Sequence, residues 1–431
     1  MRKTIKYPLE ALSVFKENLL SYSRREDFVC VLDHNEQEMP VEASAFDMLV
    51  AIGAHEVLIE DTGYAFEALQ TFHDKHQDWL FGYLSYELKN ELEALHSANH
   101  DGLDSPDLLF FVPKFVLFLS DNELHIHLHE SLDEKDAQDL IDQILDSNTL
   151  DQESGIPEIK PRISKEAYLE SIKNIQSDIK RGEIYELNFC QEFYAEDVDI
   201  VPERLFMKLN EISQAPFSVY FKAKEQYLLS ASPERFLKKT ASRLISQPIK
   251  GTRKRGRDLA EDLQLKQELY NDPKERSENV MIVDLVRNDL SKTAKKGTVK
   301  VDELFGVYSY LQVHQMISTV SAELSENYTW VDAIKAAFPM GSMTGAPKVR
   351  AMELIEQYES TKRALYSGAV GYVKPNGDFD FNVVIRSILY NKIKNYLSFM
   401  VGGAIIMKAD ADKEYDECML KAQAMFNVLS K

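Results

Sequence analysis

The chain has 431 residues, of which 44% are hydrophobic and 28% charged. These proportions exclude an intrinsically disordered protein, and the length suffices for a large buried core. Its 70 acidic and 50 basic side chains give a formal charge of −20, which argues against non-specific binding to nucleic acid or to an anionic membrane.

The three cysteines, Cys30, Cys190 and Cys418, are far apart and lack metal-ligand spacing. This pattern excludes a disulfide scaffold and a zinc module, and it favours a reducing compartment. No secretory signal is visible, and no run approaches the roughly 20 apolar residues of a membrane span. We therefore expect a cytoplasmic enzyme that binds neither nucleic acid nor membranes.

Up to about residue 130, short apolar runs predict strands at Phe28–Leu32, Trp79–Leu84 and Leu108–Leu119. The segment Ser131–Ile156 begins as an acidic amphipathic helix, becomes polar and is followed by Pro157 and Pro161, which makes it the candidate boundary. We predict an N-terminal α+β subdomain over residues 1–150 and a second domain over residues 160–431.

In the second domain, a helix is predicted over Ser164–Arg181, because isoleucines recur at helical spacing and Gly182 follows. Further helices are predicted at Leu259 to about Leu290, Val331–Phe338, Lys348–Gln357 and Lys413–Leu429. Strands are predicted at Glu183–Phe193, Phe217–Phe221, Tyr227–Ser230, Leu244–Ile249, Val299–Val301, Tyr308–Ser321, Tyr366–Val373, Asn382–Tyr390 and Tyr396–Met407. Strands and helices come in blocks without βαβ alternation, which predicts an α+β fold with large, mostly antiparallel sheets.

Two predicted helices carry acidic pairs, Glu275 with Glu278 and Glu414 with Glu417. Each pair is three residues apart and so lies on one face, and Lys421 is one turn beyond Glu417. If the faces met, they would form an oxygen-rich site suited to Mg²⁺, which prefers one or two carboxylates plus waters and a substrate oxyanion. From spacing alone, solvated helix faces with a Glu–Lys pair remain the favoured interpretation.

Two loops also contain candidate residues. Thr344 and Gly345 lie in a turn before a predicted helix, where free backbone N–H groups favour a carboxylate or phosphate. A capped helix with Pro347 near its first turn explains the pattern equally well. Lys250 lies at a strand end between Pro-Ile and Gly-Thr, where desolvation would lower its pKa and make it a nucleophile. From the sequence alone, a solvated basic loop remains the favoured interpretation of the segment around Lys250.

Single residues give weaker signals. Glu234 is either a general acid or a turn residue paired with Arg235, and His314 lies in an apolar run, where a hydrogen-bonded core histidine is the commoner case. Arg386 lies in a β-branched run, where a charge is expensive unless paired. We therefore predict that Arg386 binds a carboxylate, either of the protein or of a ligand. Gly402–Gly403 marks either close backbone approach to a ligand or a bulge.

Together these motifs resemble the chorismate-utilising enzymes, a family that includes anthranilate synthase component I, aminodeoxychorismate synthase component I and the isochorismate and salicylate synthases. The motifs occur in the family's order: GEIYELNFCQEF, SPERFL, PIKGTRKRG, ENVMIVDLVRNDL, HQMIST, AAFPMGSMTGAPKVRAMELIE, YSGAVGY, VVIRS and EYDEC–LKA. The match runs nearly continuously through residues 164–431 and is looser before it. The resemblance implies a sandwich of sheets with helices outside, and a chorismate-binding catalytic domain over residues 160–431.

The resemblance also implies roles for the acidic pairs. Glu278 and Glu417 would be Mg²⁺ ligands, Glu275 and Glu414 would hold its waters, and the metal would clamp the ring carboxylate of chorismate. His314 would lie near the ring. The implied substrate-binding residues are Thr252, Thr344, Gly345, Tyr366, Arg386, Gly402, Gly403 and Lys421.

Two positions separate the branches of this family. Lys250 stands where anthranilate and isochorismate synthases have alanine, and Glu186 stands where isochorismate and salicylate synthases have a water-activating lysine. Both residues favour the aminodeoxychorismate synthase branch. The resemblance then implies that Lys250 attacks C2 of chorismate, that Glu234 protonates the departing 4-hydroxyl, and that ammonia attacks C4.

Nothing in the chain resembles a glutaminase, so the resemblance implies a separate glutamine amidotransferase subunit that supplies the ammonia. The product, 4-amino-4-deoxychorismate, would feed a lyase that makes p-aminobenzoate for folate. Two alternatives stay open. One is an anthranilate synthase component I, which would also release pyruvate, and the other is a non-catalytic chorismate-binding subunit, which would not turn over chorismate with ammonia.

Overall fold

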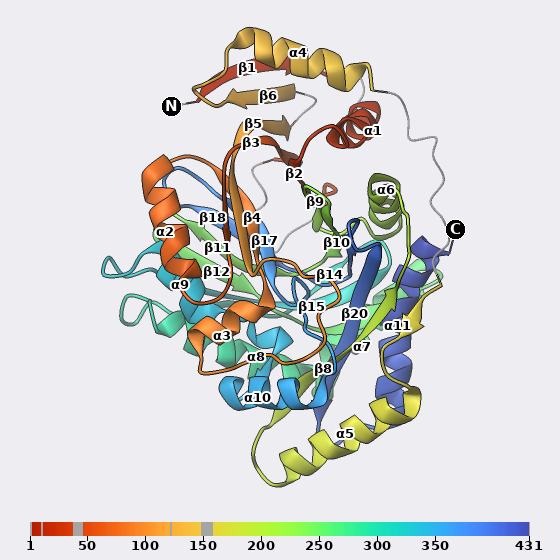
Figure 1. The fold of residues 1–431 in the computed structure, drawn as a ribbon. Helices are drawn as coiled ribbons and strands as arrows, with labels where there is room; N and C mark the ends of the chain where they lie inside the picture. The colour runs from red at the N-terminus through yellow and green to blue at the C-terminus, as the bar shows by residue number, and fades with distance from the viewer. Residues whose placement is uncertain (1, 10–11, 38–45, 121–122, 148–157, 431) are drawn as a thin grey trace.

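The computed structural model describes residues 2–9, 12–37, 46–120, 123–147 and 158–430 (Figure 1). Within these residues, twenty strands join in one continuous sheet. The ladders between its named strands are antiparallel. The predicted α+β class with large antiparallel sheets is therefore confirmed.

The N-terminal segment supplies part of this sheet. Its elements are β1 (Lys3–Pro8), α1 (Leu12–Ser23), β2 (Phe28–Asp33), β3 (Met48–Glu60), α2 (Ala65–His76), β4 (Leu80–Leu84), the 3-10 helix η1 (Tyr86–Leu88), α3 (Lys89–Leu92), β5 (Leu108–Ser120), β6 (Glu123–Leu128) and α4 (Glu134–Leu145). Strands β2, β4 and β5 match predicted runs, whereas α1, α2 and β3 were not predicted. The candidate boundary begins as the predicted helix, α4, but its residues 148–156 lie outside the described residues, so the domain division stays a prediction.

The rest of the chain alternates blocks of strands and helices. Its elements are β7 (Lys160–Pro161), α5 (Lys165–Lys180), β8 (Glu186–Ala195), α6 (Pro202–Ser213), β9 (Phe217–Ala223), β10 (Gln226–Ser232), β11 (Arg235–Thr240), β12 (Arg243–Gln247), β13 (Ile249–Lys254), α7 (Leu259–Asn271), α8 (Pro273–Ser291), β14 (Lys300–Ser309), β15 (Val313–Glu323), α9 (Trp330–Ala337), η2 (Gly341–Met343), β16 (Gly345–Ala346), α10 (Lys348–Tyr358), β17 (Ala369–Val373), β18 (Phe379–Val383), β19 (Ser387–Asn391), β20 (Tyr396–Ile406) and α11 (Ala411–Leu429). Helix α5 confirms its prediction, since the Ser164 side chain caps its first turn by accepting from the Ala167 N–H.

Two predicted elements are each two elements in the structure. The helix expected from Leu259 to Leu290 ends at Asp272, whose side chain caps the start of α8 while Pro273 takes its first position. The strand expected over Tyr308–Ser321 is a hairpin of β14 and β15, closed by a hydrogen bond from the Tyr310 N–H to the Val313 carbonyl.

Two more predicted strands are also divided. The run Leu244–Ile249 is split at Pro248 into β12 and β13, because proline cannot donate to a ladder. The run Asn382–Tyr390 is split into β18 and β19 at Arg386, whose φ is +52°. This left-handed conformation turns the chain out of one strand direction.

The sheet has two arms that meet at β5. One arm continues through β3, β2, β9, β10, β19, β20 and β8, and the other through β4, β17, β18, β11, β12 and β15. Phe28 and Phe221 of the first arm share one buried cluster with Phe81 and Tyr372 of the second. The arms therefore pack face to face, and the predicted sandwich is confirmed.

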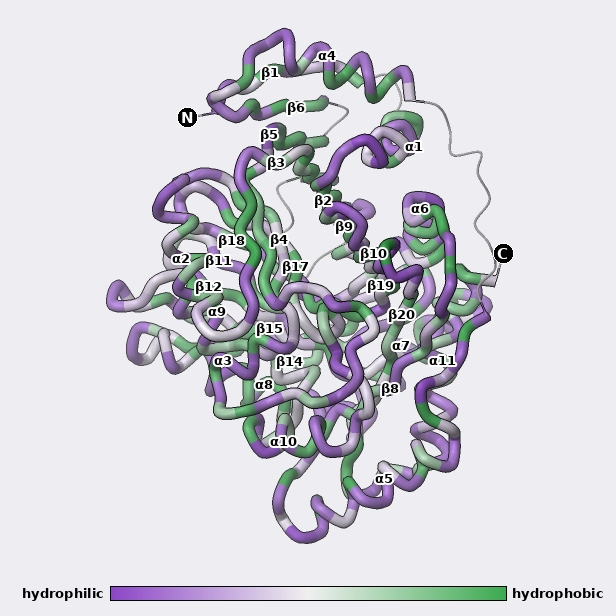
Figure 2. The backbone as a smooth tube through the Cα atoms, in the orientation of Figure 1, coloured by the Kyte–Doolittle hydropathy of each residue, from purple (hydrophilic) through white to green (hydrophobic). Residues whose placement is uncertain are grey.

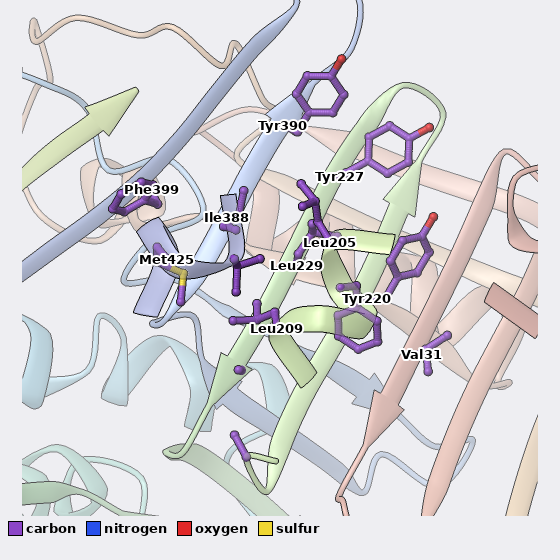
Figure 3. Packing of buried hydrophobic residues seen from close by; sticks show 14 of the residues in the cluster. Val31, Leu205, Leu209, Tyr220, Tyr227, Leu229, Ile388, Tyr390, Phe399 and Met425 are labelled. Carbon is purple, nitrogen blue, oxygen red and sulfur yellow. The ribbon is translucent and has the colours of Figure 1, made fainter. Parts of the chain in front are cut away.

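Helices cover the outer faces of both arms (Figure 1). On the first arm, Leu205 and Leu209 of α6 and Met425 of α11 join the same buried cluster as Tyr220 and Leu229 of the strands (Figure 3). Helices α2, α8 and α9 pack on the second arm. Figure 2 shows the matching pattern of hydropathy. Hydrophobic colour concentrates in the central strands, whereas hydrophobic and hydrophilic stretches alternate along outer helices such as α4 and α5. No helix in the described residues is both long and apolar enough to cross a membrane.

Candidate functional site

Lys250 is held inside the molecule at the start of β13. Its side chain is 12% exposed, and its Nζ donates to Oε1 of Glu186 on β8 at 2.8 Å. Burial lowers the pKa of Lys250, but the negative charges of Glu186, Glu278 and Glu234 outweigh it and raise the pKa above its usual value. The expected depression of the pKa is thus wrong for this state of the protein, because sequence spacing did not reveal three nearby carboxylates.

Glu234 lies between β10 and β11 and is 5% exposed. Its backbone is fixed on both sides, with its N–H donating to the Ser232 hydroxyl and its carbonyl accepting from the Val383 N–H. Burial raises the pKa of its carboxyl to about 7, against the lowering effect of Lys250. A carboxyl with this pKa can give and take a proton near neutral pH, as expected of a general acid.

The four acidic residues come from two helices, Glu275 and Glu278 from α8 and Glu414 and Glu417 from α11. All four act electrostatically on the ammonium of Lys274, whose pKa burial lowers and these carboxylates raise more strongly. The Lys274 Nζ lies 3.7 Å from Oε1 of Glu278. The two acidic pairs therefore lie within electrostatic range of one cation, and Glu417 also forms the (i, i+4) pair with Lys421 that the alternative interpretation predicts. The choice between a metal site and solvated helix faces stays a prediction.

The acidic cluster consists of carboxylates, the oxygen donors that the predicted Mg²⁺ prefers. Among the described residues, no three carboxylate, imidazole or thiol groups converge closely enough to chelate a metal as they stand. Mg²⁺ needs only one or two protein carboxylates and keeps several waters. Oε1 of Glu278 is buried and accepts no hydrogen bond from the described residues, and burial raises the pKa of this carboxyl to about 7. A buried carboxylate oxygen whose ion pair with Lys274 is as long as 3.7 Å fits a hard cation.

Lys421 links α11 to the glycines of β20. Its Nζ donates to the Gly402 carbonyl at 3.0 Å and pairs with Oε1 of Glu417 at 2.8 Å. A Cβ at Gly402 would lie 2.2 Å from the Phe189 carbonyl, whereas one at Gly403 would meet only Glu414 Oε2 and Lys421 Nζ at ordinary contact distance. The β8–β20 register is unbroken here, so Gly402–Gly403 is not a bulge.

The Thr344–Gly345 turn lies against the Glu186 strand. Gly345 and Ala346 form β16, which pairs with Leu187 and Glu186. The Thr344 N–H donates to the Gly341 carbonyl, and its hydroxyl donates to the Met340 carbonyl. The expected free amide at Thr344 is therefore wrong, because the 3-10 helix η2 uses it before α10 begins.

Arg386, between β18 and β19, carries a charge that the described residues do not neutralise. Its guanidinium makes no hydrogen bond or ion pair with any residue that the structure describes, and burial lowers its pKa while Tyr366 opposes this effect. Tyr366 is buried, and its hydroxyl contacts Cys190 Sγ at 3.8 Å. A largely desolvated guanidinium without a carboxylate is costly, so of the two predicted anchors the structure favours a carboxylate from a ligand.

His314 and Thr252 pair with residues other than those described above. The His314 ring is fully buried, with Nε2 3.0 Å from Asp262 Oδ1 and Nδ1 2.9 Å from Ser309 Oγ. Both ring nitrogens are thus engaged, and the contacts match a hydrogen-bonded core histidine rather than a catalyst. Thr252 is exposed and pairs with Gln315. Their functional roles stay predictions that these contacts do not support.

Arg363 was not identified from the sequence, although it holds several parts of the site together. It is 1% exposed and donates to the Glu359 carboxylate, to the Met343 carbonyl at 2.6 Å and to the Asn188 carbonyl at 2.8 Å. It therefore ties α10 to the Thr344 turn and to β8. No local pattern marks this residue, because its partners lie up to 175 residues away.

Comparisons with known proteins agree with this architecture. A family model described as chorismate binding enzyme matches residues 34–427. An aminodeoxychorismate synthase from Streptomyces griseus is 38% identical over 81% of the chain, and the anthranilate synthase component 1 of Thermus thermophilus is 33% identical over 81% of the chain. The match covers 49% of the first relative and 76% of the second, so the chain spans about half the length of the Streptomyces protein.

Among solved structures, anthranilate synthase component I from Streptococcus pneumoniae superposes with a TM-score of 0.79 at 23% sequence identity. The superposition covers 91% of this chain and 94% of that one. At this identity the likeness supports the fold.

Proposed function

The chain belongs to the chorismate binding enzyme family, and we propose that within it the chain aminates chorismate at C4 to give 4-amino-4-deoxychorismate. One observation carries the proposal. Lys250 Nζ is buried beside Glu186 and in the electrostatic field of Glu234, a carboxyl whose pKa of about 7 suits a general acid. A nucleophile and a proton donor are the two groups that replacement of a hydroxyl through a covalent intermediate requires.

The substrate is a dicarboxylate in this proposal. The guanidinium of Arg386, which no described residue neutralises, would bind the enolpyruvyl carboxylate with the help of Tyr366. The ring carboxylate would lie near Thr344 and Gly345 of the turn beside β8. Lys421 would complete the surroundings of the ring carboxylate, and the Gly402–Gly403 backbone would help to hold the enolpyruvyl carboxylate.

The acidic cluster would hold Mg²⁺. Glu278 and Glu417 would bind the ion directly, and Glu275 and Glu414 would hold its waters. The open oxygen of Glu278 and the oxygen-only donor set support this assignment. When bound, the ion supplies charge stabilisation and orientation at a substrate carboxylate.

The chain's own residues perform the bond changes. The free amine of Lys250 attacks C2, the ring double bonds shift, and the 4-hydroxyl leaves as water with a proton from Glu234. Ammonia then attacks C4 and Lys250 departs as a neutral amine. Glu234 takes the extra proton from the new C4 ammonium and returns to its starting state, so atoms and charges balance.

Ammonia would come from a glutamine amidotransferase partner. The Thermus relative is named as a component 1, and the Streptomyces relative is about twice as long as the matched region. Both facts favour additional polypeptide beside a chain of this kind. A partner would deliver ammonia rather than the less reactive ammonium ion.

A second candidate is anthranilate synthase component I, which the Thermus relative favours. That reaction also eliminates pyruvate, so the products separate the two candidates. Purified chain would be incubated with chorismate, Mg²⁺ and ammonium at mildly alkaline pH, and the products identified by mass spectrometry.

Aminodeoxychorismate without pyruvate is expected, and Lys250→Ala should lose most of the amination. Anthranilate with pyruvate would support the second candidate. Absence of turnover with retained chorismate binding would favour a non-catalytic chorismate-binding subunit, and full activity of Lys250→Ala would remove the nucleophile role.

A further inference from the structure

We infer that Glu186 is a catalytic residue, the proton acceptor that converts the Lys250 ammonium into the amine that attacks the substrate. This inference rests on the proposed function and adds to it a residue with no role in the chemistry above. An ammonium has no lone pair, so a lysine that begins charged among carboxylates must lose a proton before it can act as a nucleophile. The acceptor must lie within hydrogen-bond reach.

The geometry singles out Glu186. Its Oε1 lies 2.8 Å from the Lys250 Nζ, although the two residues are 64 positions apart in the chain. Within the described part of the chain, no other side chain hydrogen-bonds or forms an ion pair with Lys250. Glu234 and Glu278 act on the lysine only electrostatically.

The carboxylate of Glu186 is also held rigidly and is incompletely used. Its side chain is 2% exposed, and its backbone at the start of β8 is paired on both sides, with Ile406 of β20 and with Ala346 of β16. Oε2 is buried without any hydrogen-bond partner among the described residues. A buried carboxylate oxygen without a donor is destabilising, which is hard to explain for a purely structural ion pair.

The neighbouring carboxyls are occupied by other tasks. Glu234 must carry a proton when the hydroxyl leaves, so it cannot also accept one from Lys250 at the start. Glu278 would be bound to Mg²⁺. Glu186 therefore remains as the acceptor. Glu234 then exchanges a proton only with the leaving hydroxyl and the new amine, and Glu186 exchanges one only with Lys250.

The proton balance of the cycle closes with this assignment. Glu186 takes one proton from the Lys250 ammonium and becomes a neutral acid, and the lysine amine forms the bond to C2. When ammonia has attacked C4 and the C2–N bond breaks, the lysine leaves as a neutral amine. Glu186 then returns its proton, which restores the ammonium–carboxylate pair seen in the structure.

Rapid acid quench and intact-protein mass spectrometry would test this role. The experiment uses chorismate and Mg²⁺ without ammonium and measures the rate at which the chorismate-derived adduct forms on Lys250. Glu186→Gln keeps the size and the hydrogen-bonding oxygen but cannot accept a proton. We expect adduct formation to slow by about 10²-fold or more, while chorismate binding, measured by equilibrium titration, changes little.

Two further variants test whether substitution of Glu186 slows adduct formation only by disturbing the structure. Glu186→Ala should be slow and should recover part of its rate with added formate, a small carboxylate that can replace the missing acceptor. Glu192→Gln removes another buried carboxylate of β8, which pairs with Arg162, and should leave the adduct rate near that of the wild type.

The outcomes separate the two proposals. Adduct formation by Glu186→Gln at the wild-type rate would overturn the role of Glu186 alone, as would a slow Glu186→Ala that formate does not accelerate. No adduct in the wild type, together with amination by Lys250→Ala, would overturn the covalent route through Lys250, and formation of anthranilate with pyruvate would overturn the proposed function itself.

Discussion

Replacement of Arg363 by methionine should destabilise the protein far more than the loss of an ordinary ion pair. The side chain is fully buried, and its removal takes the cation from the Glu359 carboxylate and one donor from each of the Met343 and Asn188 carbonyls. Removal of one partner of a buried ion pair costs about 3–5 kcal/mol. The stranded carboxylate dominates this loss, because the two residues are 1% and 2% exposed and water cannot replace the guanidinium.

Urea unfolding followed by circular dichroism would measure the loss, with Arg350→Met as the matched control. Arg350 is 41% exposed and pairs with Glu183 and Glu353, so its loss should cost at most about 1 kcal/mol. The double variant Arg363→Met/Glu359→Gln should be more stable than Arg363→Met, because no buried charge remains unpaired. Equal destabilisation by Arg363→Met and Arg350→Met would refute the reasoning.

Two further predictions concern the site. Burial raises the pKa of Glu234 to about 7, so its acidic form is lost as pH rises through 7 and the amination kcat should fall there. Glu234→Gln should lower kcat by about 10²–10⁴-fold and should not show this fall with pH. A wild-type pH profile in Glu234→Gln would contradict the role of Glu234 as general acid. Lys274→Met removes the cation on which the four acidic residues act, so Mg²⁺ binding measured by calorimetry should tighten about tenfold. The control variant Lys292→Met should have little effect on this affinity. Unchanged affinity in Lys274→Met would show that Lys274 does not compete with the metal.

The sequence predicted most of what depends on local pattern. Apolar runs located β2, β4 and β5, and isoleucine spacing followed by Gly182 located α5. The errors arose where a single residue interrupts an otherwise continuous pattern, as Pro273 does in the long helical stretch and Arg386 does by its positive φ. Hydrophobic periodicity is the same on both sides of such a residue, so it does not show the break.

The candidate site was predictable only through its motifs. Their resemblance to a known family identified the acidic pairs and Lys250, but residue spacing could not tell that the pairs lie within electrostatic range of each other. Contacts between distant strands, such as Lys250 with Glu186, depend on which strands become neighbours. The pKa of Lys250 was predicted in the wrong direction for the same reason, since its sign is decided by carboxylates that are distant in sequence.

The continuity of the sheet has a consequence for cooperativity. Strand β4 of the N-terminal segment is the neighbour of β17, and β2 is the neighbour of β9, so residues before and after position 150 share backbone ladders as well as a core. Neither half can open without exposing unpaired strand edges of the other. A ligand that binds beside Lys250 therefore stabilises the N-terminal strands as well, even though they contribute none of the residues proposed to act on the substrate.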